Sequence, residues 1–310
     1  MKFEREGNRI FLSQPKHIAH GLEELGLTNC KPSSTPLTPN LQLREASDED
    51  HEKFKKLNIN YRSAIGLMNY IASNTRPDLS FAVSSLARYS VKPGISHWKE
   101  VKKTWQYIRR TRDFKFTIDA TKPEEFLSIY SDSTWGDDPD SRTSQSGYLC
   151  YLFGSLISWN SCRQRSITYS STEAELNPLV ESFHEGVWLK ALINEMWKLK
   201  IESADHIIND EELNKQLTVD DMTFKELYCT NHLIDNKGLN DKLKKFGSNS
   251  KTCHIDLRTK GIRQEIKANN IKITLVKTQD MIADVLTKPT SIKPIKNLIK
   301  TINPVFLSQM

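Results

Sequence analysis

The sequence lacks the paired cysteines of a disulfide-rich secreted protein. Its five cysteines are odd in number and widely scattered, with no Cys-x-x-Cys pair and no histidine at zinc-finger spacing. No apolar run approaches the roughly 18 residues that cross a bilayer, and residues Met1 to Arg9 lack the apolar core of a signal peptide. These absences predict an intracellular protein in a reducing compartment, with no membrane partner.

Several signatures of hydrolytic chemistry are missing as well. The sequence has no Gly-rich phosphate loop, no Gly-x-Ser-x-Gly turn and no His-Glu-x-x-His motif. Charge excludes little: 44 Lys and Arg against 38 Asp and Glu give a net charge of +6, which suits a phosphate-bearing partner but is also typical of an ordinary solvated surface. At 310 residues, the chain is long enough for two domains.

The first third of the chain has helical periodicity. Apolar residues recur at helical spacing in 15–25, 61–74, 79–89 and 98–108. The segment 31–56, first rich in proline and then polar, predicts a long exposed loop. The last of these helices also carries basic residues, most of them outside its apolar seam: Lys99, Lys102, Lys103, Arg109 and Arg110. That basic face suits contact with a nucleic-acid backbone, and a plain solvated surface explains it equally well.

After about Thr111 the apolar period changes to that of β-strands. Short strands are predicted at 114–118, 126–130, 147–153, 156–159 and 166–169, followed by a long helix from Thr172 to about Leu199. A strand at 224–229, helical segments to about Ala268, a strand at 271–276 and a helix from about Asp280 complete the order. This order predicts an α/β fold, a ribonuclease H-like mixed sheet with helices, preceded by a mostly α-helical region.

Three acidic residues stand at informative places in this order. Asp132 follows a predicted strand, Glu175 lies one turn into the long helix, and Asp284 begins the last helix. Each has an ordinary explanation, either as a turn residue or as a complement to the helix dipole. Jointly they present carboxylates from separate elements, as hard cations require, and two Mg²⁺ ions about 4 Å apart can support phosphodiester hydrolysis. Glu173 points to a different helix face and is the weaker candidate.

A series of motifs in the second half resembles the ribonuclease H domain of copia-type (Ty/copia) long-terminal-repeat retrotransposon Gag-Pol polyproteins. The motifs are the run from Tyr130 to Tyr148, Ile157-Ser-Trp159, Ser170-Ser-Thr-Glu-Ala-Glu175, Cys253-His-Ile-Asp-Leu-Arg258 and Ala283-Asp-Val-Leu-Thr-Lys-Pro289. Upstream motifs resemble the C-terminal part of the same polyprotein's reverse transcriptase. These are Ile10-Phe-Leu-Ser-Gln14, Cys30-Lys-Pro-Ser-Ser-Thr-Pro-Leu37, Tyr61-Arg-Ser-Ala-Ile-Gly66, Thr75-Arg-Pro-Asp-Leu-Ser-Phe-Ala-Val83 and His97-Trp98.

The resemblance implies a division of the chain. Residues 1–118 are expected to form a reverse transcriptase C-terminal, thumb- or connection-like fragment, residues 119–290 a ribonuclease H-like domain, and residues 291–310 a C-terminal tail. The polymerase signature Tyr-x-Asp-Asp does not occur, so no polymerase activity is expected from this truncated remnant. The implied partners are an RNA:DNA hybrid and other retrotransposon proteins, and the implied locations are the cytoplasm and the nucleus.

The resemblance also implies a two-metal Mg²⁺ site with Asp132, Glu175 and Asp284 as catalytic metal ligands. Where the family has Tyr-Cys-Asp-Asn, this chain has Tyr228-Cys-Thr-Asn231, so Thr230 occupies the expected fourth position. Glu226 would lie roughly 13 Å away along the strand, and Asp235 is expected beyond the strand, on a separate element. The prediction is therefore lost or weak hydrolysis, with a noncatalytic hybrid-binding module or an active Mg²⁺-dependent ribonuclease H as alternatives.

Overall fold

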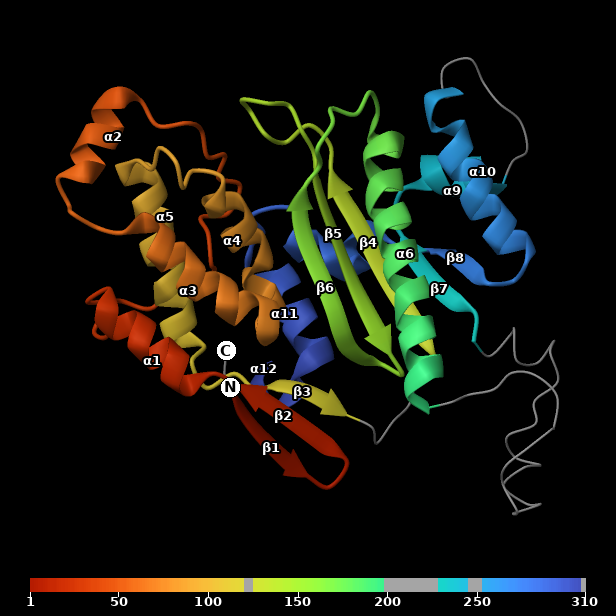
Figure 1. Ribbon diagram of the computed structural model, residues 1–310, viewed down its shortest axis with the longest axis horizontal. Coiled ribbons are helices and arrows are strands. Elements are labelled where there is room, and N and C mark those ends of the chain that lie inside the picture. Colours follow the sequence, from red (N-terminus) through yellow and green to blue (C-terminus); the bar gives the residue numbers. More distant parts are fainter. Residues whose placement is uncertain (120–124, 198–227, 245–252, 308–310) are drawn as a thin grey trace.

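The computed structural model describes residues 1–119, 125–197, 228–244 and 253–307 (Figure 1). A mixed sheet of five strands lies at the centre of this part, in the order β6-β5-β4-β7-β8. Its strands are β4 (Leu127–Thr134), β5 (Gln145–Leu152), β6 (Ser155–Arg163), β7 (Thr230–Ile234) and β8 (Ile271–Leu275). The first three pair antiparallel, and β7 and β8 continue the sheet in parallel. This topology confirms the predicted α/β class and the ribonuclease H-like order.

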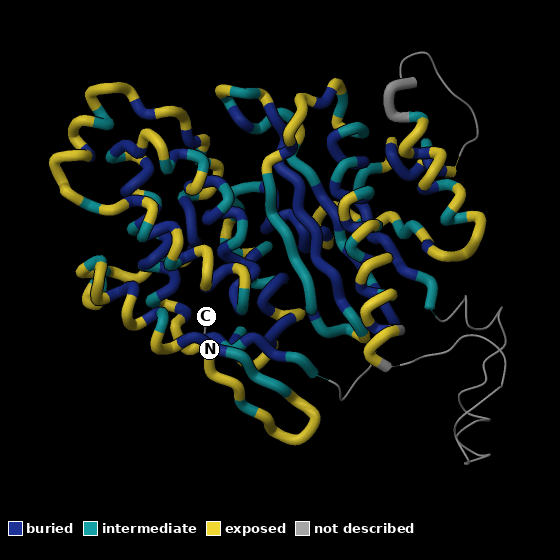
Figure 2. Tube along the Cα trace, viewed as in Figure 1, coloured by how far each residue is buried: buried dark blue, intermediate teal, exposed yellow. Residues whose placement is uncertain are grey.

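Both faces of the sheet are covered, as strand β5 shows. Tyr148 and Cys150 pack with the helix α6 (Ser171–Trp197), whereas Leu149 and Tyr151 belong to the cluster on the opposite face. Because successive side chains of a strand point to opposite faces, a strand buried on both sides reads as a continuous apolar run. Figure 2 shows these central strands as mostly buried, and α6 crosses one face of the sheet in Figure 1. Helices α9 (Lys237–Lys244) and α10 (Cys253–Lys267) follow β7.

The N-terminal region is mostly helical, as predicted. Its helices are α1 (Pro15–Glu24), α2 (Asp48–Lys55), α3 (Tyr61–Asn74), η1 (Pro77–Leu79), α4 (Ser80–Ala87) and α5 (Ile95–Arg110). A small antiparallel sheet of β1 (Lys2–Glu6), β2 (Arg9–Ser13) and β3 (Phe116–Asp119) ties the two ends of this region together. The hairpin of β1 and β2 was not anticipated from the sequence.

Two local expectations were wrong, and a third lies mostly outside the described residues. The polar stretch that was expected to be part of a loop contains α2. Ser47 accepts a hydrogen bond from the Asp50 N–H, and acidic residues occupy the first turn. Capping and dipole effects therefore stabilise a helix with little apolar surface. Residues 166–169 form no strand. Most of the strand expected at 224–229 lies outside the described residues; of the part that is described, 228–229 form no strand, and β7 follows at Thr230.

The C-terminal segment begins with short 3₁₀ turns, not with the single helix expected from Asp280. They are η2 (Thr278–Asp280) and η3 (Ile282–Leu286), and they precede α11 (Ile292–Ile302) and α12 (Pro304–Leu307). Asp284 therefore lies in η3. None of the described helices combines the length and the apolar composition that a bilayer-spanning helix needs.

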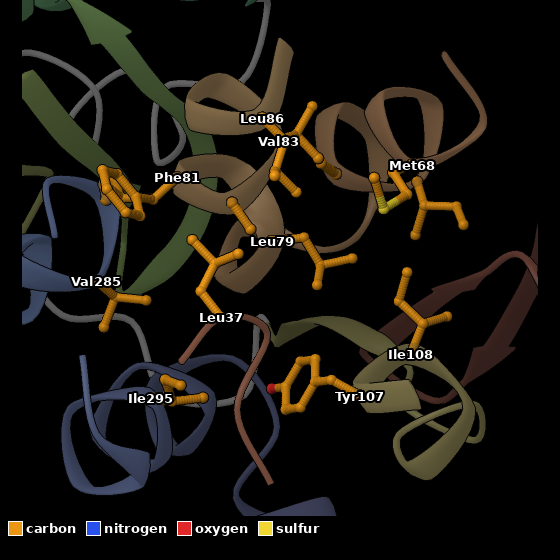
Figure 3. Packing of buried hydrophobic residues seen from close by; sticks show 14 of the residues in the cluster. Leu37, Met68, Leu79, Phe81, Val83, Leu86, Tyr107, Ile108, Val285 and Ile295 are labelled. Carbon is orange, nitrogen blue, oxygen red and sulfur yellow. The ribbon is translucent and has the colours of Figure 1, made fainter. Parts of the chain in front are cut away.

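One hydrophobic cluster joins the N-terminal region, the sheet and the C-terminal helix. Trp105 of α5, Leu149 of β5 and Ile299 of α11 all belong to it. Figure 3 shows Leu37 and Phe81 of the N-terminal region close to Val285 and Ile295 of the C-terminal segment. The boundaries near residues 118 and 290 stay a prediction, and residues 291–310, expected as a tail, include a helix whose apolar face is buried in this cluster.

Polar contacts also connect the N-terminal helices to the sheet. The indole N–H of Trp159 in β6 donates to the carbonyl of Ala72, at 3.1 Å. Arg88 Nη1 lies 3.0 Å from Asp138 Oδ2 in the loop after β4, and the side-chain amide of Gln145 donates to Ser84. The helical region is therefore packed against β5 and β6 by specific contacts as well as by apolar burial.

Candidate metal centre

Three carboxylates meet at the carboxyl ends of β4 and β7. One carboxylate oxygen from each of Asp132, Glu175 and Asp235 lies within 4.8 Å of the other two. Asp132 and Glu175 are buried, and Asp235 is half-buried. Among the acidic, histidine and cysteine side chains of the described residues, these three lie close enough together to hold a metal ion.

The parallel pairing of β4 and β7 explains why Asp132 and Asp235 are level. Tyr130 pairs with Leu233. Asp132 and Asp235 each follow two residues later, and because the strands are parallel they lie at the same level. Asp235 directly follows β7, and Asn236 then caps α9 by accepting the Leu239 N–H at 2.8 Å. The strand therefore delivers Asp235 to the edge where the carboxyl ends of parallel strands present functional groups.

Thr230 lies at the other end of the same strand. It pairs with Leu127, five residues before Asp132, so about 16 Å of extended chain separates the two levels. Its side chain is buried near α6, where a Cβ added at Gly186 would be 3.8 Å from the Thr230 methyl group. The structure differs here from the expectation: it places Asp235 in the cluster and Thr230 away from it.

A signal for Asp235 was present in the sequence. The dipeptide Asp-Asn that the family motif requires occurs at Asp235-Asn236, directly after the apolar pair Leu233-Ile234 and before a segment of amphipathic helical spacing. The similarity of Tyr228-Cys229 to the family motif pointed instead to position 230, five residues earlier. Glu226 lies outside the described residues.

Glu175 reaches the cluster from the first turns of α6. The Ser170 hydroxyl caps this helix by accepting the Glu173 N–H, while Glu173 accepts the Tyr169 N–H. Glu173 therefore serves the helix end, and Glu175 faces the sheet. Oxygen Oε2 of Glu175 is buried without a hydrogen-bond partner in the described part of the chain, which is unusual for a buried polar atom.

Asp284 is carried by η3. Its carboxylate is 2.7 Å from the ammonium nitrogen of Lys288, and its charge contributes to the electrostatics of Asp132. Asp284 lies outside the closest group of three carboxylates. The three predicted carboxylates thus converge on one region, together with Asp235, which was expected beyond the strand on a separate element.

The segment carrying Asp284 is held tightly against the sheet. The Thr287 hydroxyl donates to Asp132 Oδ2 at 2.5 Å, and Ser161 and Thr134 donate to the carbonyls of Leu286 and Thr287. Gly147, the register partner of Asp132, lets this segment approach closely, since an added Cβ would lie 2.6 Å from Leu286 Cβ.

Burial and mutual repulsion perturb the acidic groups. Burial, followed by the charge of Asp284, raises the pKa of Asp132 to about 8, against the opposing effects of Lys288 and the Thr287 hydrogen bond. Burial, then Asp132 and Asp235, raise the pKa of Glu175 well above its usual range, although the Ser133 backbone N–H opposes this. Clustered carboxylates of this kind are typical of functional sites that bind cations.

Comparisons with known proteins agree with the motif series. No family model matches the chain. It is 31% identical over 287 residues to the retrovirus-related Pol polyprotein from transposon TNT 1-94 of Nicotiana tabacum, covering 92% of this chain and 19% of that protein. Over 134 residues it is 40% identical to the secreted RxLR effector protein 161 of Plasmopara viticola, covering 43% of this chain and 92% of that protein.

Among solved structures, the chain resembles the ribonuclease H1 LC11 isolated from compost. The two share 10% sequence identity with a TM-score of 0.34, over 53% of this chain and 94% of the other. A similarity at that level carries no inference about function. The chain spans about a fifth of the length of the TNT 1-94 polyprotein. Its ordered motifs, its sheet topology and the similarity over 92% of its own length show that the chain belongs to the copia-type retrotransposon Pol polyproteins and contains their ribonuclease H-like domain.

Proposed function

We propose that the chain hydrolyses the RNA strand of RNA:DNA hybrids in a Mg²⁺-dependent reaction. The observation that carries this proposal is the position of Asp235, which completes the carboxylate set with Asp132, Glu175 and Asp284. The expectation of lost or weak activity depended on Thr230 as the site of a missing ligand. The position of Asp235, level with Asp132, argues against that ground for inactivity.

The residues suit hard divalent cations. All the donors are carboxylate oxygens, which Mg²⁺ prefers in proteins. Glu175 Oε2 is buried and unpartnered among the described residues, and the Asp132 carboxyl is buried against other acids. Both features have a physical explanation if cations neutralise the cluster, because buried like charges are otherwise costly.

In the proposed reaction the chain mainly positions charge. Asp132, Glu175, Asp235 and Asp284 would hold the cations, and bound cations supply an activated water and stabilise the departing 3′ oxygen. Thr287 keeps one Asp132 oxygen oriented, and Ser133 donates its backbone N–H to Glu175. The sheet and η3 thus hold the carboxylates in place before substrate arrives.

The first test compares cleavage of a labelled RNA:DNA hybrid in Mg²⁺ by the native chain and two variants. Asp235→Asn removes one charged ligand without changing its size, and we expect a loss of roughly 100-fold or more. Asp241→Asn is the matched control, because Asp241 is an exposed residue of α9 outside the cluster. It should cleave like the native chain.

A third variant separates this proposal from the original expectation. Thr230→Asp places a carboxylate in a buried position near α6, so we expect lower stability and no gain in cleavage. An inactive native chain whose activity is restored by Thr230→Asp would reject the role of Asp235. Equal activity of the native chain and Asp235→Asn would reject it as well.

Noncatalytic hybrid binding by the basic face of α5 is less well supported. Lys103 donates to the Thr38 hydroxyl at 2.9 Å, and the Arg109 guanidinium donates to the Cys30 carbonyl. Two of the five basic side chains therefore hold the loop 30–39 against α5. This alternative stays a prediction, and loss of hybrid affinity with rising salt would be its signature.

A further inference from the structure

We propose that the ammonium group of Lys288 is the internal counter-charge of the cation-free carboxylate cluster, and that Lys288 releases Asp284 when a divalent cation binds. This inference rests on the proposed function, because it concerns the same site. It adds a role for a basic residue that is not one of the expected metal ligands.

The contact geometry places Lys288 at the cluster. Its Nζ atom lies 2.7 Å from Asp284 Oδ1, one helical turn earlier in the sequence. The side chain of Asp284 is 12% exposed, whereas that of Lys288 is 40% exposed. The carboxylate is therefore nearly enclosed, while the lysine stem reaches it from the surface.

The charge of Lys288 acts on more than its direct partner. It opposes the rise in pKa of both Asp132 and Glu175. Burial by itself would lower the pKa of Lys288, but Asp132, Asp284 and Asp235 outweigh burial and raise it. One ammonium group therefore interacts favourably with all four carboxylates.

Another basic group near this edge of the sheet is already engaged. Arg88 pairs with Asp138, which also accepts backbone hydrogen bonds from Asp140 and Ser141. The charges of both Arg88 and Lys288 lower the pKa of Asp137 against the effect of its burial. Only Lys288 of these two contacts a carboxylate of the cluster within the described residues.

Lys288 is suited to be displaced. An ammonium on a flexible four-carbon stem is a point charge without fixed geometry, and the Lys288 side chain that pairs with Asp284 is itself 40% exposed. A divalent cation brings twice the charge and binds several carboxylate oxygens at once. Lys288 and the divalent cation therefore compete for the Asp284 carboxylate. This competition determines the cation concentration at which the site is occupied.

The experiment measures cation binding and stability without substrate. Lys288→Met keeps an unbranched side chain and removes the charge, Lys288→Arg keeps the charge, and Lys293→Met is the matched control at an exposed position of α11. Mg²⁺ binding is measured by titration calorimetry, and melting temperature is measured in EDTA and in saturating Mg²⁺.

Removing the charge should lower the stability of the cation-free chain and raise its affinity for Mg²⁺. In EDTA, Lys288→Met should melt roughly 3 °C below the native chain, because the buried carboxylates lose their counter-charge. Its Mg²⁺ affinity should rise about tenfold, because the competing cation is gone, and saturating Mg²⁺ should abolish the difference in melting temperature. Lys288→Arg and Lys293→Met should resemble the native chain in EDTA.

The outcomes distinguish this inference from the proposed function. If the native chain binds Mg²⁺ and Lys288→Met has unchanged or weaker affinity, displacement is wrong while the metal centre stands. If Lys288→Met melts like the native chain in EDTA, the counter-charge role is wrong. A native chain that binds no Mg²⁺ would overturn the displacement together with the proposed function.

Discussion

At the scale of single residues, His232 is an unusual member of the central sheet. It is fully buried in β7, and neither ring nitrogen has a hydrogen-bond partner among the described residues. Its ring centroid lies 6.5 Å from that of Phe183 on α6. Burial, with a smaller effect of Lys190, lowers the pKa of His232 to about 3.

This histidine should make the protein sensitive to acid. Between its unfolded pKa of 6.5 and its folded pKa of about 3, only the unfolded chain binds the proton, so stability falls as the pH falls. At pH 5 this amounts to about 2 kcal/mol. His232→Leu should therefore stabilise the chain by about 2 kcal/mol more at pH 5 than at pH 7.5.

Urea unfolding at the two pH values provides the measurement. His184→Leu is the control, because His184 is exposed on α6 and its substitution removes no buried imidazole. A His232→Leu stabilisation that is equal at both pH values would show that His232 is not buried in the neutral form.

At the scale of elements, the approach of η3 to β5 decides the geometry of the carboxylates. Strand β5 offers Gly147 opposite Asp132, and η3 places Leu286 and Thr287 directly over it. An alanine Cβ at this position would lie 2.6 Å from Leu286 Cβ and 2.9 Å from the Thr287 methyl group. Either the strand or the segment with Asp284 would have to move.

Gly147→Ala should therefore weaken both the fold and the site. We expect a loss of about 1–3 kcal/mol in the free energy of unfolding, as for other overpacked positions. Mg²⁺ affinity should fall as well, because Asp284 and Thr287 are displaced from Asp132. Gly66→Ala in α3 is the control, since an added Cβ there meets nothing within 4 Å. Native Mg²⁺ affinity in Gly147→Ala would contradict the proposed close packing as a determinant of the site.

At the scale of the whole molecule, the N-terminal helices and the ribonuclease H-like sheet share one core. Leu298 of α11 is fully buried in the cluster that also contains Trp105 and Leu149. A common core couples the unfolding of its parts, because neither can open without exposing apolar surface of the other. We therefore expect one unfolding transition for the chain, not two.

Leu298→Ala tests this coupling. The cavity should lower the free energy of unfolding by about 2–5 kcal/mol. The unfolding midpoints measured by tryptophan fluorescence and by far-ultraviolet circular dichroism should both move to the same lower temperature. Val91→Ala, at an 82% exposed position, should leave both curves unchanged. Two separate transitions, of which only one shifts, would show that the parts unfold independently and would favour the boundary expected near residue 118.

Several elements could be predicted from local sequence alone. The helix α6 and the strands around Asp132 and Leu149 were expected close to their observed places, because period and turn residues act over a few neighbours. Helix α2 was missed because capping and charge, not apolar spacing, stabilise it. The hairpin of β1 and β2 was missed because its strands are mostly exposed and depend on pairing with the distant β3.

The sequence by itself determined the family, the class of fold and three acidic residues that converge in the structure, since motifs and periodicity are local properties of the chain. Tertiary structure decided that Asp235 is level with Asp132 and that Thr230 is not, because the register of two parallel strands about 100 residues apart is a nonlocal property. It also brought Lys288 near the same carboxylates, since these come from β4, the residue after β7, α6 and η3. Interactions between neighbours along the chain determined which helices and strands form, and packing between those elements determined which carboxylates lie together.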